Sequence, residues 1–197
     1  MTEICLVRHG ETEWNQLGKL QGRTDTELDD NGIQQAKECA KALSGQQWSA
    51  IVTSPLRRAY RTAELIQEQL QIPLLEMEDF IERSFGTAEG MTVEERLTAY
   101  PDRIYPQQET EAHLEQRLRA ALNKLQAEYP QGQVIVVSHG AVINYLLRTM
   151  CMHDMEIPRH SLVNGSMSTI TLRDGAWHVQ DFNMTHHFSH YKEIGKM

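Results

Sequence analysis

The sequence lacks the features that mark several broad classes of protein. Only three of its 197 residues are cysteines, Cys5, Cys39 and Cys151, and they lie far apart without the spacing of metal ligands. We therefore expect small buried thiols, which suit a reducing cytoplasm. The N-terminus has no basic region followed by an apolar core, so we expect no signal peptide and a cytoplasmic location.

Positive charge and long apolar runs are also scarce. The net charge is -8 and the isoelectric point is near 5.6, and the chain has no basic stripe of the kind that binds nucleic acid. No apolar stretch approaches the roughly 20 residues that a membrane-spanning helix needs. We expect neither nucleic acid nor a membrane as a partner. An acidic protein that binds an anion must gather its arginines at one place.

The chain has no repeats and no low-complexity linker, and its length fits a single domain over residues 1–197. Short, continuous and partly β-branched apolar runs are typical of strands buried on both faces, and they occupy residues 4–7, 50–53 and 134–137. Apolar residues recur at helical spacing in residues 31–43, 54–70 and 138–150. Strands that alternate with helices predict an α/β fold with helices on both faces of the sheet.

Three local signals refine this outline. Ser54 and Pro55 suit the N-cap and the first position of the second helix. Asp174-Gly175 lies between two strand-like runs and predicts a β-hairpin. Residues 86–112 contain two prolines and scattered charge, and they form either an excursion that covers a site or a plain surface loop with one short helix.

Polar residues follow each of the predicted strands. The first strand ends in Arg-His-Gly at residues 8–10, and the third ends in Ser-His-Gly at residues 138–140. The second leads into a helix that carries Arg57 and Arg58. Because open α/β sheets bind ligands beyond the carboxyl ends of their strands, we expect two histidines and at least two arginines at one edge.

These residue types suit a phosphate monoester. Arginine's planar fork matches phosphate oxygens, and helix starts after residues 10, 54 and 139 would add N–H groups. Neighbouring arginines disfavour the imidazolium form, so a histidine there stays neutral and can attack phosphorus to give a phosphohistidine that water hydrolyses. A carboxyl group with a raised pKa would protonate the leaving alcohol.

Five blocks of the sequence together resemble the histidine phosphatase superfamily, the phosphoglycerate-mutase-like proteins, and in particular its broad-specificity bacterial phosphatases. The blocks occur in the family's order over residues 4–147, and they are LVRHGETEWN, LQGRTDTELDDNGIQQA, TSPLRRAYRTAE, FIERSFGTAEG and VVSHGAVI. The resemblance implies a three-layer αβα sandwich with a mostly parallel mixed sheet and a small cap-like excursion at about 86–112. It also implies a reaction that needs neither metal nor cofactor.

The resemblance also implies roles for single residues. His9 matches the phosphorylated nucleophile, and Glu82 matches the general acid/base. Arg8, Arg58 and His139 match the rest of the phosphate pocket. The matching substrate-binding positions are Arg8, Asn15, Gln21, Gly22, Arg58 and Gly140.

Several of these assignments have rivals. Glu89 lies in the same block as Glu82 and is the other candidate acid, although the spacing to the block's glycines favours Glu82. Arg57 or Arg61 would take the place of Arg58 if Arg58 only pairs with a carboxylate such as Glu64. Ala88 stands where many relatives carry a large aromatic residue, which affects the inferred substrate rather than the chemistry.

Three alternative functions remain at this point. The family's mutases are usually longer and carry a basic insertion, whereas this excursion has only Arg96 and Arg103, so we favour hydrolysis of a small phosphomonoester. A phospholigand-binding protein without activity is the second alternative. A metalloenzyme is the third, because the tail THHFSH contains His186, His187 and His190, although a solvated tail is the simpler interpretation. The natural substrate and the oligomeric state stay open.

Overall fold

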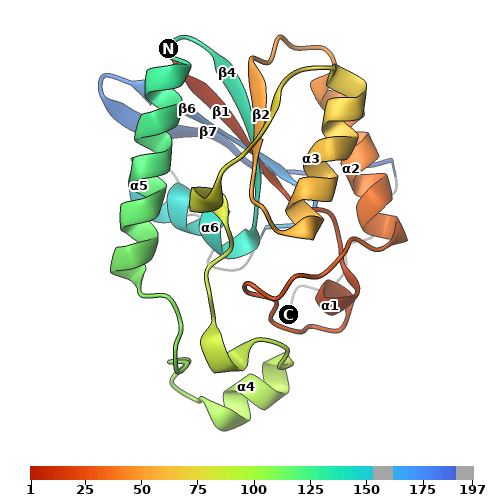
Figure 1. Ribbon diagram of the computed structural model, residues 1–197, viewed down its shortest axis with the longest axis vertical. Coiled ribbons are helices and arrows are strands. Elements are labelled where there is room, and N and C mark those ends of the chain that lie inside the picture. The colour runs from red at the N-terminus through yellow and green to blue at the C-terminus, as the bar shows by residue number, and fades with distance from the viewer. Residues whose placement is uncertain (153–161, 190–197) are drawn as a thin grey trace.

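The computed structural model describes residues 1–152 and 162–189, which form a seven-stranded sheet between two layers of helices (Figure 1). The strand order is β3-β2-β4-β1-β6-β7-β5. The strands are β1 (Glu3–Arg8), β2 (Ala50–Thr53), β3 (Leu74–Glu76), β4 (Gln133–Ser138), β5 (Cys151–Met152), β6 (Met167–Arg173) and β7 (Ala176–Met184). The four strands from β3 to β1 are parallel and β6 is antiparallel to β1, so the sheet is mixed as predicted.

The helices that cover this sheet vary widely in length. They are α1 (Glu13–Gln16), α2 (Asp30–Leu43), α3 (Arg57–Leu70), α4 (Val93–Ala99), α5 (Glu111–Glu128) and α6 (Gly140–Tyr145). Shorter turns of 3₁₀ helix occupy Glu78–Phe80 and Gly86–Ala88, and a π-helical turn, Leu146–Met150, extends α6.

Alternate residues of the central strands pack against different helices, which produces the three layers. Ile4 and Leu6 of β1 belong to the core beneath α5 and α6, whereas Cys5 and Val7 belong to the core beneath α2 and α3. Figure 1 shows α5 and α6 on one side of the sheet and α2 and α3 on the other. The αβα sandwich predicted from the sequence is confirmed, and so are the three buried strands.

The start predicted for the second helix was wrong. Helix α3 begins at Arg57 and not at Pro55, and its N-cap, Leu56, makes no side-chain capping bond. The Ser54 N–H donates to the carbonyl of Val137 at 3.1 Å, so Ser54 still belongs to the sheet edge. The first helix after β1 likewise starts late, at Glu13. The expected helix start after residue 139 is present in α6.

The remaining sequence signals have clear structural counterparts. Strands β6 and β7 form the predicted hairpin, with positive φ angles of 50° at Asp174 and 80° at Gly175 that match a tight hairpin turn. The excursion over residues 86–112 contains α4, whose start is fixed by a capping box of Thr92 and Glu95. In Figure 1, α4 stands apart from both helical layers, below α5.

The C-terminal histidines are not on a helix as far as Ser189, the last described residue of this segment. His187 Nε2 lies 3.2 Å from the carbonyl of Gly165 and 3.4 Å from Cys39 Sγ. His190, the third histidine of this tail, lies outside the described residues. Over residues 1–152 and 162–189, no group of three or more His, Cys, Asp or Glu side chains is arranged to hold a metal ion. No helix in those residues is long and apolar enough to cross a membrane.

Candidate active site

The carboxyl ends of three parallel strands bring the predicted site residues together. Strand β4 lies between β2 and β1, and the His9 N–H donates to the carbonyl of Ser138 at 2.9 Å. Arg58 reaches the same edge from the first turn of α3, and His139 directly follows β4. We call five residues at this edge the strand-end cluster: Arg8, His9, Arg58, Glu82 and His139. Their side chains are buried or nearly so, and Arg58 and His139 are completely inaccessible to solvent.

His9 presents a nitrogen lone pair to the cluster. Its Nδ1 lies 2.7 Å from the carbonyl of Gly10, which can only accept a hydrogen bond, so Nδ1 carries the proton. Its Nε2 accepts from Arg58 Nε at 3.3 Å. Burial lowers the pKa of His9 well below its usual value of 6.5, and the charges of Arg58 and Arg8 lower that pKa further. The ring is therefore neutral at pH 7, and the lone pair of Nε2 has the chemistry that a nucleophile needs.

His139 presents an N–H group instead. Its Nε2 lies 2.7 Å from Ser54 Oγ, and this nitrogen is the one acceptor within reach of the Ser54 hydroxyl proton among the described residues, so we assign Ser54 as the donor and Nε2 as the acceptor. Burial, followed by the charge of Arg58, lowers the pKa of His139 well below 6.5. The neutral ring therefore carries its proton on Nδ1. That buried atom has no hydrogen-bond partner among the described residues, and the ring centroid lies 5.2 Å from that of His9.

Arg58 is held by the loop that follows α1. Its Nη1 donates to the carbonyl of Thr24 at 2.9 Å, and its Nη2 donates to the carbonyl of Gly22 at 2.7 Å. Burial lowers the pKa of Arg58 to about 10, which leaves the guanidinium charged at neutral pH. Glu64, its suggested partner, pairs with Arg61 at 3.3 Å instead. No carboxylate of the described residues forms an ion pair with this buried cation, which suits it to an anionic ligand.

The other arginines of this helix point elsewhere. The side chain of Arg57 is 67% exposed and pairs with Asp25 and Glu27 on the surface. Arg61 is also exposed and pairs with Glu64 and Glu68. Of the three arginines in the SPLRRAYR segment, Arg58 alone contacts the strand-end cluster.

Arg8 supplies a second cation. Its Nη1 donates to the carbonyl of Leu162 at 2.5 Å, and its buried Nε has no partner among the described residues. A Cβ atom at Gly140 would lie 3.4 Å from that Nε, so the glycine keeps the approach to Arg8 open. Arg8 Nε and His139 Nδ1 are thus two buried donors without a partner among the described residues, which is rare unless a ligand is bound there.

Glu82 lies against the N-terminus of α6. One oxygen accepts from the Ala141 N–H at 3.3 Å, and the other accepts from Val142 at 3.3 Å and from Arg83 at 2.8 Å. Burial raises the pKa of Glu82, although those hydrogen bonds and the charges of nearby arginines partly oppose the rise. A buried carboxyl group with a raised pKa can hold a proton for a leaving group.

Glu89, the rival acid, fastens two loops together. Its carboxylate accepts from the backbone N–H groups of Arg23 and Thr24, both at 3.1 Å, and from Phe85 at 2.9 Å. Gly22 is required beside it, because Gly22 has a φ of 53° and a Cβ there would lie 2.2 Å from Glu89 Oε1. The backbone donors of Glu89 lie in the loop after α1 and at Phe85, whereas two of those of Glu82 lie in the first turn of α6, directly after His139. Ala88, the departure from the family pattern, is completely buried.

Two of the predicted substrate-binding side chains bond mainly within their own loop. Asn15 Oδ1 accepts from the Thr12 N–H at 3.2 Å as part of the cap of α1. Gln21 Oε1 accepts from the hydroxyl groups of Thr12 and Thr26. They support the loop whose carbonyls hold Arg58, and none of these bonds reaches the strand-end cluster.

Sequence reasoning missed three residues that contact the cluster. Ser54, expected to be a helix cap, bonds to His139. Thr62 Oγ1 donates to the carbonyl of Arg58 at 2.7 Å, and Asn164 Nδ2 donates to the carbonyl of His9 at 3.1 Å. Asn164-Gly165 is a turn signal in the sequence, but nothing in the sequence places that turn beside residue 9.

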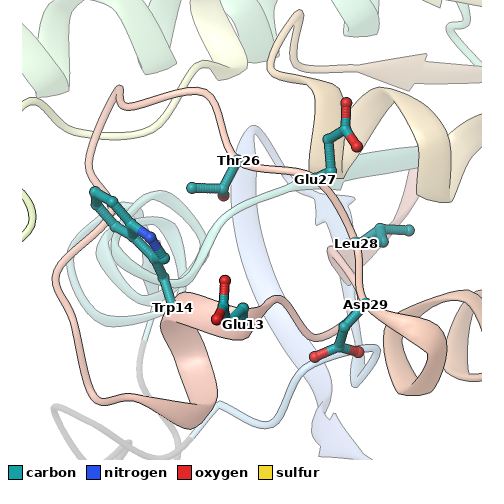
Figure 2. A pocket seen from close by; sticks show the side chains of 6 residues that line it. All are labelled: Glu13, Trp14, Thr26, Glu27, Leu28 and Asp29. Atoms are coloured by element: carbon teal, nitrogen blue, oxygen red, sulfur yellow. The ribbon is translucent and has the colours of Figure 1, made fainter.

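A surface hollow of about 310 Å³ lies close to this loop but is separate from the cluster (Figure 2). None of the cluster's residues lines it. Its lining residues are Glu13, Trp14, Thr26, Glu27, Leu28 and Asp29. The three carboxylates around this hollow make it unsuited to a phosphate.

Comparison with known proteins identifies relatives over nearly the whole chain. The model of the histidine phosphatase superfamily (branch 1) matches residues 4–185. The uncharacterized phosphatase PhoE of Bacillus subtilis is 47% identical, over 96% of this chain and 98% of that protein. The metal-independent phosphoserine phosphatase of Arabidopsis thaliana is 31% identical, over 96% of this chain and 84% of that protein.

One solved structure is similar in both sequence and fold. It is a crystal structure of a mutant of the phosphoserine phosphatase from Entamoeba histolytica in complex with phosphoserine. That chain is 35% identical to this one and has a TM-score of 0.79, and the match covers 95% of this chain and 99% of that one.

Proposed function

The chain belongs to the histidine phosphatase superfamily, and we propose that it hydrolyses small phosphomonoesters through a phosphohistidine on His9, without a metal ion. One observation carries this proposal. A buried histidine, kept neutral by its surroundings, places the lone pair of Nε2 beside the guanidinium of Arg58. That arrangement pairs a nucleophile with a site for the phosphate oxygens that it would attack.

In the first step, His9 Nε2 attacks phosphorus and forms a nitrogen–phosphorus bond while the bond to the leaving oxygen breaks. Arg58 Nε turns from His9 to a phosphoryl oxygen, and Arg8 Nε and His139 Nδ1 donate to the others. These groups stabilise the charge that spreads over the equatorial oxygens in the transition state. Glu82 gives its proton to the leaving alkoxide, which departs as a neutral alcohol.

In the second step, Glu82 acts in the opposite direction. Its carboxylate takes a proton from a water molecule as the water oxygen attacks the phosphohistidine. The nitrogen–phosphorus bond breaks, His9 returns to its neutral form and orthophosphate leaves. The protonated Glu82 is then ready for the next substrate, so the cycle balances without a co-reactant.

The ligand bound in a related structure, phosphoserine, is the first compound to test as a substrate. The relative from Entamoeba histolytica binds phosphoserine, and we propose a small phosphomonoester of this kind as a substrate here. The acidic surface and net charge of -8 disfavour a large polyanion. A cytoplasmic location stays a prediction from the sequence.

The first experiment measures hydrolysis of p-nitrophenyl phosphate and a panel of metabolite phosphates, which includes phosphoserine, phosphoglycerates and sugar phosphates. Every assay contains EDTA, and His9→Ala is assayed beside the wild type. Turnover that resists EDTA and is lost in His9→Ala supports the proposal, and the ranking of the panel points to the substrate class. Turnover that EDTA abolishes would contradict metal independence.

Two further assays test the two remaining alternatives, which are a mutase and a binding protein without activity. A bisphosphate-primed transfer assay that gives activity where hydrolysis gives none would identify a mutase, which shares the same core residues. Failure to trap a phosphoenzyme, together with tight binding of phosphate esters, would identify a binding protein. The presence of all five residues of the strand-end cluster argues against that second outcome.

A further inference from the structure

Glu109, a buried carboxylate near the end of the excursion over residues 86–112, contacts side chains that also bond to the segment around Glu82. Glu109 precedes α5, and its side chain is only 4% exposed. Arg117 of α5 binds both of its oxygens, with Nε–Oε1 at 2.8 Å and Nη2–Oε2 at 2.9 Å. His113 Nδ1 approaches Oε1 at 2.7 Å from the solvent side. This two-point contact holds both side chains in one geometry.

Arg117 extends the contact to the segment that carries the proposed acid. Its third nitrogen, Nη1, donates to the carbonyl of Asp79 at 2.6 Å. Asp79 lies in the short turn Glu78–Phe80, three residues before Glu82. The position of this turn is therefore coupled to the pair of Glu109 and Arg117.

Two further arginines link Glu109 to Glu82 itself. Arg23 Nη2 lies 3.3 Å from Glu109 Oε1, and Arg23 Nε donates to the backbone carbonyl of Glu82 at 3.1 Å. Arg83 Nε donates to the backbone carbonyl of Glu109 at 3.0 Å, while the Arg83 N–H donates to Glu82 Oε1 at 2.8 Å. Glu82 is thus connected to Glu109 through its own carbonyl and through the following residue.

This arrangement exceeds what stability alone requires. A buried ion pair often adds little net stability, because removing two charges from water offsets their attraction. The bonds here converge on residues 79–83, and they come from the loop after α1, the end of the excursion and α5. Proton transfer is sensitive to such positioning, since a displacement of about 1 Å can cost roughly 100-fold in rate.

We propose that Glu109 is a positioning residue that orients the Glu82 carboxyl group toward the leaving oxygen. This inference rests on the proposed function, because it requires Glu82 to act as the acid. The Glu109 carboxylate contacts Arg23, His113 and Arg117, none of which belongs to the strand-end cluster. Its effect on catalysis passes through Arg23, Arg83 and Arg117.

The test compares two leaving groups in the full-length protein. Phosphoserine releases an alkoxide that needs a proton, whereas p-nitrophenyl phosphate releases a phenolate that scarcely needs one. We expect Glu109→Gln to lower kcat on phosphoserine by about 10- to 100-fold, as for a misplaced catalytic group, and kcat on p-nitrophenyl phosphate by much less. Glu115→Gln is the matched control, because Glu115 lies on α5 and pairs with Arg119 at 2.8 Å on the surface.

A double-mutant cycle identifies the route of the effect. If Glu109 acts through Glu82, then Glu109→Gln adds almost nothing to the loss that Glu82→Gln already causes on phosphoserine. An equal loss on both substrates, or a full additional loss in the Glu82→Gln background, would overturn the proposal. Either result would give Glu109 a purely structural role.

A second variant covers the case in which Glu109→Gln does not fold. Arg23→Met removes one link to Glu82 and leaves the pair of Glu109 and Arg117 intact, and the Arg23 side chain is 38% exposed. It should show the same preference for p-nitrophenyl phosphate at a smaller amplitude. If Glu82→Gln prefers p-nitrophenyl phosphate but both Arg23→Met and Glu109→Gln show no preference, only this inference fails. If Glu82→Gln shows no preference, the acid role in the proposed function fails with it.

Discussion

Two turns of almost the same sequence lie side by side at the strand ends, Arg8-His9-Gly10 after β1 and Ser138-His139-Gly140 after β4. Both histidines are buried and neutral, and both carry the proton on Nδ1. They differ in the atom that faces the cluster. His9 directs Nδ1 to its own turn and presents the lone pair of Nε2, whereas His139 directs Nε2 to Ser54 and presents Nδ1–H.

The difference teaches that a motif does not define a role. One turn offers an electron pair and the other offers a proton donor, because each ring finds a different fixed partner. A nucleophile and an oxyanion donor are the two groups that phosphoryl transfer requires next to each other. The four predictions below test this difference in order of expected effect.

The largest effect is expected from His9. Because His9→Ala removes the proposed nucleophile, we expect kcat to fall at least about 10³-fold and the phosphoenzyme to disappear. His139→Ala removes only a donor, so it should cost roughly 10²- to 10³-fold and still form phosphoenzyme. Rapid-quench trapping with labelled substrate measures both, and the exposed His186→Ala serves as the control. Phosphoenzyme in His9→Ala but none in His139→Ala would reverse the two roles.

The charge of Arg58 lowers the pKa of both histidines, and we expect its removal to have the second-largest effect on activity. Arg58→Ala should weaken transition-state stabilisation by about 2–4 kcal/mol, as for the loss of one preorganised donor. The measurement is kcat/KM on p-nitrophenyl phosphate, with Arg57→Ala and Arg61→Ala as matched neighbours. A near-normal Arg58→Ala beside an impaired neighbour would move the role along the helix.

In stability, unlike in activity, the two histidines should be equivalent. In the folded state both histidines have a pKa below the usual 6.5. As the pH falls below about 6.5, these histidines therefore become protonated in the unfolded chain while they stay neutral in the folded chain. Each histidine should therefore lower the free energy of unfolding by roughly 1 kcal/mol per pH unit, from pH 6.5 down to its depressed folded pKa.

Urea unfolding of the wild type, His9→Ala and His139→Ala at several pH values between 7 and 5 measures this dependence. Each single variant should show a shallower loss of stability on acidification than the wild type, by the same amount. A change in only one of the variants would mean that the other histidine is not buried in its neutral form.

Ser54 should have the smallest effect. Ser54→Ala removes one hydrogen bond from His139, worth about 0.5–1.5 kcal/mol, which corresponds to roughly a 3- to 10-fold loss of kcat. Ser54→Ala should cause no further loss of kcat when His139 is already replaced by alanine. It should cause its usual loss when it is combined with a substitution far from His139. A full loss that remains in His139→Ala would show that Ser54 acts elsewhere.

Much of the fold could be predicted because it depends on local patterns. Continuous apolar runs predicted β1, β2 and β4, and Asp174-Gly175 predicted the hairpin between β6 and β7. Local patterns gave a wrong helix start where a side chain bonds to a residue far away in the sequence. Ser54 has every property of a helix cap, yet its hydroxyl bonds to a histidine 85 residues away and α3 starts three residues later.

The sequence by itself determined which chemistry is assembled, because strands and their ends are specified by short-range periodicity, and parallel strands carry their ends to one edge. It placed His9, Arg58 and His139 at that edge. Only the tertiary structure decided which nitrogen of each ring faces the cluster, which glutamate lies against the helix that follows His139, and how Glu109 is linked to Glu82. Those outcomes depend on hydrogen bonds between segments far apart in the chain, and their geometry exists only once the layers have packed.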